Sequence, residues 1–164
     1  MKAILPGLNG MLNVHPIFVH FPIVFWLGAL LFEALAVLRP APGGAGLRSS
    51  DELHRTAARL LYLGTLAGLL AVGTGLLAEE AVPEKGPAHE VLELHETLML
   101  ITTSLALGLC MVAFFLRNNF TPGRRKLLLL GLLAVAGLLT IGADRGAQLV
   151  YQYGTAVNWP AAPK

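Results

Sequence analysis

The stretch LLYLGTLAGLLAVGTGLLA, residues 60–78, contains no charged residue. A helix of about 20 apolar residues is long enough to cross the hydrocarbon core of a bilayer. Gly64, Gly68, Ala71 and Gly75 fall on one stripe of this helix, and small residues in such a stripe let helix backbones approach closely in lipid. The stretch therefore predicts a membrane-spanning helix with a face suited to close packing.

Three further apolar stretches lie before and after it. With the turn-forming residues between them, spans are predicted at about 16–38, 58–80, 92–117 and 125–146. Hydrophobic residues make up 55% of the chain and charged residues 13%, whereas a soluble domain carries about 25% charged residues. The 164 residues are thus predicted to form one all-α membrane domain, a bundle of four antiparallel transmembrane helices.

Basic residues are unevenly divided between the two ends of these spans. Eight of the 12 lysines and arginines flank the first and third links, namely Arg39, Arg48, Arg55, Arg59, Arg117, Arg124, Arg125 and Lys126. The other four are Lys2, Lys85, Arg145 and Lys164. Because cytoplasmic loops carry an excess of lysine and arginine, both links are predicted to be cytoplasmic. The two termini then lie in the periplasm, across a bacterial inner membrane.

Ionisable side chains gather at the predicted outer end of all four spans. They are His15, His20, Glu79, Glu80, His89, Glu93, His95, Glu96, Asp144 and Arg145. Of the five histidines only His54 lies at the cytoplasmic end. Ionisable residues at membrane depth are costly and usually serve a function, so this layer is the candidate site.

His20 and His95 are the predicted ligand pair within this layer. Each adjoins the start of an apolar span, and the first and third spans lie diagonally in an up-down-up-down bundle. His15 and His20 are five residues apart, about 140° around an ideal helix, so they do not share one ion from a regular helix. Two opposed imidazoles suit haem b, whose macrocycle supplies four nitrogens. A bare Cu or Zn ion is the alternative, and it would add His15 and Glu79 as ligands.

Four other charged residues have supporting roles in this interpretation. Glu79 and Asp144 are expected to accept hydrogen bonds from the ring N–H groups of the ligands, as carboxylates around metal sites commonly do. Arg145 is expected to face a haem propionate, which suits its fork of donors. Glu33 lies near the cytoplasmic end of the first span and is expected to pair with Arg59, with a proton-relay role left open as the alternative.

The string HPIFVHFP, residues 15–22, resembles the opening motif of a family of small bacterial membrane proteins, domain of unknown function 2231. The resemblance continues in GLLAE at 75–79, in His95, and in RGAQLVYQYG at 145–154. It extends over about residues 13–157. The chain departs from the family where Glu79 and Glu80 stand in place of an aspartate, and where Arg145 precedes Gly146. Some members are joined to Rieske or cytochrome-type partners, which implies electron transfer near the quinone pool.

The function predicted from these observations is a membrane subunit that binds haem b and transfers electrons near the outer leaflet. Expected partners are membrane lipid, other membrane or periplasmic redox proteins, and quinone. A Cu- or Zn-binding accessory and a structural subunit of a larger complex remain alternatives. No Ser–His motif or phosphate loop suggests a stand-alone enzyme, and nothing predicts a nucleic-acid partner. The single cysteine, Cys110, excludes a disulfide within the chain.

The orientation can be tested with reporters fused after Lys164. Because most basic residues lie at the other end, a reporter that is active only in the periplasm should be active there, and one that is active only in the cytoplasm should be silent. The opposite pattern would contradict the proposed orientation.

Overall fold

The computed structural model describes residues 14–38, 45–79, 82 and 84–155, without the side chains of 45–49. Its helices are α1 (His15–Phe18), α2 (His20–Leu38), α3 (Ala45–Ala78), α4 (Pro87–Phe115) and α5 (Pro122–Tyr151). Together α1 and α2 make one crossing, so four stretches are long and apolar enough to span a membrane. The predicted fold class, an all-α bundle of four such helices, is confirmed.

Local sequence explains where these helices start. Proline occupies the first turn of α1, α4 and α5, where its missing N–H costs no helical hydrogen bond. Gly86 precedes α4 with φ 110°, a conformation that glycine adopts readily. The helices extend beyond the predicted spans, because α3 already begins at Ala45 and α5 continues to Tyr151. Their polar ends can project past the hydrocarbon layer.

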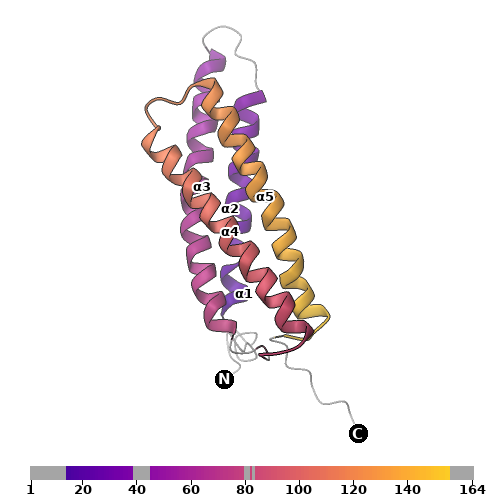
Figure 1. The fold of residues 1–164 in the computed structure, drawn as a ribbon. Coiled ribbons are helices and arrows are strands. Elements are labelled where there is room, and N and C mark those ends of the chain that lie inside the picture. Colours follow the sequence, from indigo (N-terminus) through magenta and orange to yellow (C-terminus); the bar gives the residue numbers. More distant parts are fainter. Residues whose placement is uncertain (1–13, 39–44, 80–81, 83, 156–164) are drawn as a thin grey trace, which may run out of the picture.

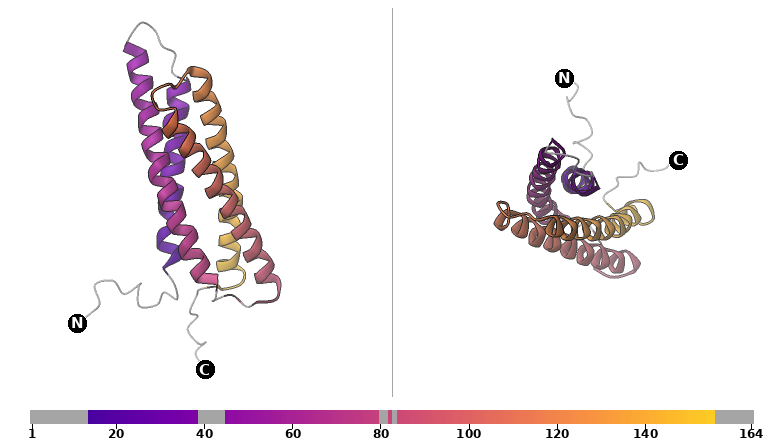
Figure 2. Two further views of the ribbon diagram at one scale, coloured as in Figure 1. Left: turned by 60° about the vertical axis from the view of Figure 1, so that its left-hand side comes forward. Right: turned by 90° about the horizontal axis from the view of Figure 1, so that it is seen from above.

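The helices are arranged as two antiparallel hairpins, α2 with α3 and α4 with α5 (Figures 1 and 2). The hairpins meet along α2–α5 and α3–α4, which places α2 diagonally opposite α4, as expected for an up-down-up-down bundle. We call the end with the start of α1 and the end of α5 the terminal end. The end with the α4–α5 turn is the loop end. The predicted histidine layer belongs to the terminal end.

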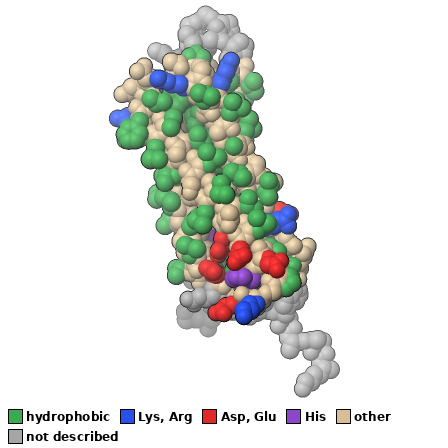
Figure 3. All heavy atoms as spheres, viewed as in Figure 1, with side chains coloured by type: hydrophobic (Ala, Val, Ile, Leu, Met, Phe, Trp, Pro, Cys, Tyr) green, Lys and Arg blue, Asp and Glu red, His purple; other side chains and the backbone are tan. Residues whose placement is uncertain are grey.

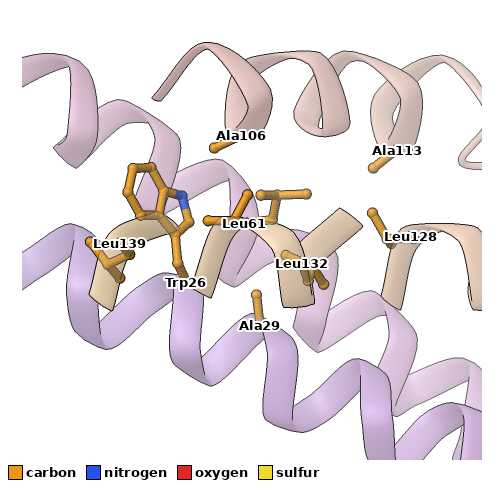
Figure 4. Close-up of a cluster of buried hydrophobic side chains, with 9 residues drawn as sticks. Trp26, Ala29, Leu61, Ala106, Ala113, Leu128, Leu132 and Leu139 are labelled. Carbon is orange, nitrogen blue, oxygen red and sulfur yellow. The ribbon is translucent and has the colours of Figure 1, made fainter. Parts of the chain in front are cut away.

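The core joins side chains from all four crossings (Figure 4). Trp26 and Ala29 of α2 lie against Leu61 of α3, and Ala106 of α4 and Leu132 of α5 complete the cluster. All five are at most 3% exposed. Because the core contains many small residues, the backbones approach closely, which is the usual basis of helix packing in lipid.

Two glycines of α3 make room for the Trp26 indole. A Cβ at Gly64 would lie 2.6 Å from Trp26 Cδ1, and a Cβ at Gly68 would lie 2.8 Å from Cζ2 and Cη2 of the same ring. Any larger residue at either position would push the indole or the helix away. The predicted small-residue stripe thus serves the contact between α2 and α3.

The lateral surface is apolar. Leucine, isoleucine, valine and phenylalanine side chains are exposed along every crossing, and in Figure 3 they cover the middle of the molecule, while acidic and histidine side chains gather at the terminal end. An exposed apolar belt between polar ends is suited to contact with lipid.

The contact between Trp26 and α3 can be tested by comparing Gly64→Ala with Gly73→Ala. The first change puts a methyl group into the indole, and overpacking of this kind costs about 1–3 kcal/mol. The second meets nothing within 4 Å. Thermal unfolding in detergent should show a lower midpoint only for Gly64→Ala, and equal midpoints would contradict the packing described.

Candidate functional site

His15 lies on α1 and packs against the C-terminal end of α3. Its Nδ1 is 3.2 Å from Thr74 Oγ1, and a Cβ at Gly75 would lie 3.1 Å from its Cε1. The Thr74 hydroxyl hydrogen is directed to helix carbonyls, with Leu70 O and Ala71 O each 3.0 Å away. With the Thr74 hydroxyl hydrogen directed to these carbonyls, Thr74 Oγ1 is placed to accept a hydrogen bond from His15 Nδ1.

His95 lies on α4 and is held by α5 in the same way. Its Nδ1 is 2.8 Å from the carbonyl oxygen of Gly142, which can only accept a hydrogen bond. A Cβ at Gly146 would lie 3.0 Å from His95 Cε1, so glycine at this position lets the ring lie against the α5 backbone. His95 Nδ1 consequently carries a proton and donates it to this carbonyl.

The two rings are brought together by different hairpins. His15 is bound to α3 through Thr74, whereas His95 is bound to α5 through Gly142. The rings are close enough to interact electrostatically. Each imidazole thus has its Nδ1 hydrogen-bonded to an oxygen atom of a neighbouring helix, an arrangement that metal-ligating histidines commonly adopt.

His20 does not share this position. Its side chain is exposed, whereas that of His15 is partly buried, so the prediction that His20 faces the bundle interior is wrong. The five-residue spacing turns the two histidines to different faces, and the break at Val19 between α1 and α2 leaves the inward one at position 15. The histidine that lies near His95 is therefore His15.

The predicted supporting carboxylates do not contact the histidines of the site. Glu79 is exposed, and Asp144 is exposed beside Arg145, with 3.8 Å between Oδ2 and Nη2. The oxygens within hydrogen-bond distance of Nδ1 are instead Thr74 Oγ1 for His15 and Gly142 O for His95, whereas both carboxylates are exposed. The roles predicted for Glu79 and Asp144 are thus taken by a hydroxyl and a backbone carbonyl. Glu80 lies outside the described residues.

Arg145 points along its own helix. Its Nη1 donates to Gln148 Oε1 at 2.8 Å, and its Nε is buried without a hydrogen-bond partner among the described residues. One donor of this guanidinium is therefore available to an acceptor. His89, also at the terminal end, lies 3.4 Å from Glu93 Oε1 within the first turns of α4.

Metal-ligating side chains are sparse across the described ranges. No group of three or more histidine, cysteine, aspartate or glutamate side chains there is placed to hold a metal ion. The set of His15, His20, Glu79 and His95 predicted for a bare ion is not assembled, because His20 and Glu79 point outward. His15 and His95 are the two imidazoles that lie near enough to each other here for an electrostatic interaction.

Glu33 at the loop end has a different partner from the one predicted. Its Oε2 is 2.8 Å from His54 Nδ1, whereas Arg59 is exposed. The pairing with Arg59 is therefore wrong. The sequence indicated that Glu33 lies near the loop end of the first span, but it did not indicate which face of α3 Glu33 meets.

The comparison with protein families identifies a family of membrane proteins. A family model described as "Predicted membrane protein (DUF2231)" matches residues 11–158. The chain belongs to this family. The matched range includes His15, His95 and the α5 glycines Gly142 and Gly146, so the whole site lies within the DUF2231 region. No curated protein and no solved structure matches the chain.

The role of Thr74 can be tested with Thr74→Val. This change keeps the shape but removes the acceptor of His15 Nδ1–H, and leaving such a donor unsatisfied costs about 1–3 kcal/mol when it is buried. Because His15 is only partly buried, we expect the lower end of this range as a reduced melting midpoint in detergent.

Thr140→Val is the matched control. Thr140 is exposed and its hydroxyl bonds only to its own helix, at Ala136 O, 2.8 Å away. If both variants melt alike, Thr74 does not orient His15.

Proposed function

We propose that this DUF2231 protein is an electron-transfer subunit that binds haem b, with His15 and His95 as axial ligands. The observation that carries the proposal is that both imidazoles have Nδ1 hydrogen-bonded to an oxygen of a neighbouring helix. Nε2 of each ring is the proposed ligating nitrogen. This revises the ligand pair predicted from the sequence, with His15 in place of His20.

The number of ligands favours haem over a bare ion. Structural Zn sites use four protein ligands and catalytic Zn sites usually three, whereas haem b needs only one or two axial ligands from the protein. Two imidazoles, with no third metal-ligating group placed beside them in the described parts of the chain, meet the second requirement. When bound, haem supplies one-electron redox chemistry.

The surrounding residues fit such a group in two ways. Gly75 and Gly146 hold the imidazoles against the helix backbones, which fixes both ligands. Arg145 has an Nε–H without a partner among the described residues, and it is the donor we assign to a propionate. Thr74 and Gly142 orient the rings, as partners of ligating histidines generally do.

The proposed setting follows from the distribution of charge. With the basic loop end in the cytoplasm, the histidine pair lies at the periplasmic side of a bacterial inner membrane. Electron partners would then be periplasmic or membrane redox proteins, or quinone in the outer leaflet.

The test is the visible spectrum of the purified protein and of three histidine variants. Wild type should show the Soret and α-bands of low-spin haem. His15→Ala and His95→Ala should each abolish the low-spin spectrum, because each removes one axial nitrogen. His20→Ala is the matched control, since the exposed His20 belongs to the same motif, and its spectrum should be unchanged.

Other results would replace the proposal. Loss of the spectrum in His20→Ala but not in His15→Ala would restore the pair predicted from the sequence. Colourless wild-type protein that retains copper or zinc until a chelator removes it would indicate the metal-binding alternative. Protein with neither haem nor metal, even when prepared from native membranes, would indicate a structural subunit.

A further inference from the structure

A second pair of titratable side chains lies at the loop end, far along the bundle from His15 and His95. Glu33 of α2 is 0% exposed and His54 of α3 is 7% exposed. Glu33 Oε2 and His54 Nδ1 are 2.8 Å apart. The other carboxyl oxygen, Oε1, is buried without a hydrogen-bond partner among the described residues.

The geometry of this contact requires a proton. A carboxylate oxygen and an unprotonated imidazole nitrogen both only accept hydrogen bonds, so a 2.8 Å contact between them contains one hydrogen. Either atom can carry it. When Nε2 is also protonated, the pair is either an imidazolium with a carboxylate or a neutral imidazole with a carboxylic acid, and its net charge is zero. When Nε2 is unprotonated and the hydrogen is on Nδ1, the imidazole is neutral and the pair carries the negative charge of Glu33.

The charged side chains nearby do not neutralise the Glu33 carboxylate, so His54 is its hydrogen-bonding partner among the described residues. Asp51, one helical turn before His54, forms an ion pair with Arg125 of α5, so each already has a counter-charge. Arg55 and Arg59 on α3 are exposed. Burying a lone carboxylate is very costly, and the only described side chain hydrogen-bonded to Glu33 is an imidazole, a group that can both accept and donate a proton.

His54 lies on the side of the pair that solvent reaches. Its ring packs against Phe120 in the turn between α4 and α5, with 4.3 Å between the ring centroids, and it retains some exposure where Glu33 has none. A proton from the loop-end surface therefore meets His54 first. The unpartnered Glu33 Oε1 lies behind it in the bundle.

We propose that Glu33 and His54 form a proton-binding site that exchanges protons with the loop-end surface. In the inward step the pair starts as a neutral imidazole, with its hydrogen on Nδ1, beside the Glu33 carboxylate. His54 Nε2 takes a proton from the solvent while Nδ1 gives its proton to Glu33 Oε2, so the pair loses its negative charge. The imidazole ends neutral in its other tautomer, and the carboxylate becomes a carboxylic acid. The reverse step returns the proton to water. This site does not depend on haem at the terminal end.

The test is pH-dependent infrared spectroscopy of the purified protein in lipid nanodiscs, with or without haem. Wild type should show a protonated-carboxyl C=O band that appears and disappears reversibly with pH and shifts in D2O. Glu33→Gln should lose this band. Asp51→Asn, which removes a nearby carboxylate outside the pair, is the matched control and should keep it.

A second variant, His54→Gln, keeps the proposal testable if Glu33→Gln does not fold. His54→Gln retains Glu33 and a hydrogen-bonding side chain but cannot accept and release protons, so the band should shift and its pH dependence should change. If the spectra of wild type and Glu33→Gln are identical at every pH, or if His54→Gln leaves the band unchanged, Glu33 and His54 are only a contact that joins α2 to α3. Neither result bears on the haem spectrum, so the two proposals fail separately.

Discussion

The close approach of α2 and α3 at the Trp26 indole is the contact on which the rest of the structure depends. In lipid, helices gain no hydrophobic energy by associating, so they are held by packing and by polar contacts between them. The indole occupies space that only glycine leaves open at positions 64 and 68. Toward the terminal end α1 brings His15 to Thr74, and toward the loop end α2 brings Glu33 to His54. A wider separation of these helices would remove both polar contacts.

The α4–α5 hairpin is built on the same principle with different residues. The Leu109 side chain lies where a Cβ of Gly131 would be, and Met99 does the same at Gly142. The second of these contacts brings α4 near enough for His95 to reach the Gly142 carbonyl. Each hairpin therefore orients one histidine by close backbone packing, and neither uses a carboxylate for this purpose.

The sequence predicted what depends on length and composition. Uncharged runs such as 60–78 identified the crossings, and the histidine motif with its companion segments identified the family. It did not predict rotation about the helix axes. His15 and His20 differ by about 140° on an ideal helix, and which of them faces inward depends on the break at Val19. In the same way, the partner of Glu33 is decided by which face of α3 meets α2.

The hydrogen bonds of the histidine side chains described above are unevenly distributed between the two hairpins. His15 with Thr74 and Glu33 with His54 belong to the crossings of the first hairpin, and His95 with Gly142 belongs to the second. The proximity of His15 to His95 spans the two. The ion pair of Asp51 with Arg125 also spans them, at the loop end. Between these two points the buried cluster of Trp26, Leu61, Ala106 and Leu132 joins the hairpins. The direction of each imidazole is therefore set within one hairpin, whereas the separation of the two imidazoles is set by how the hairpins pack against each other.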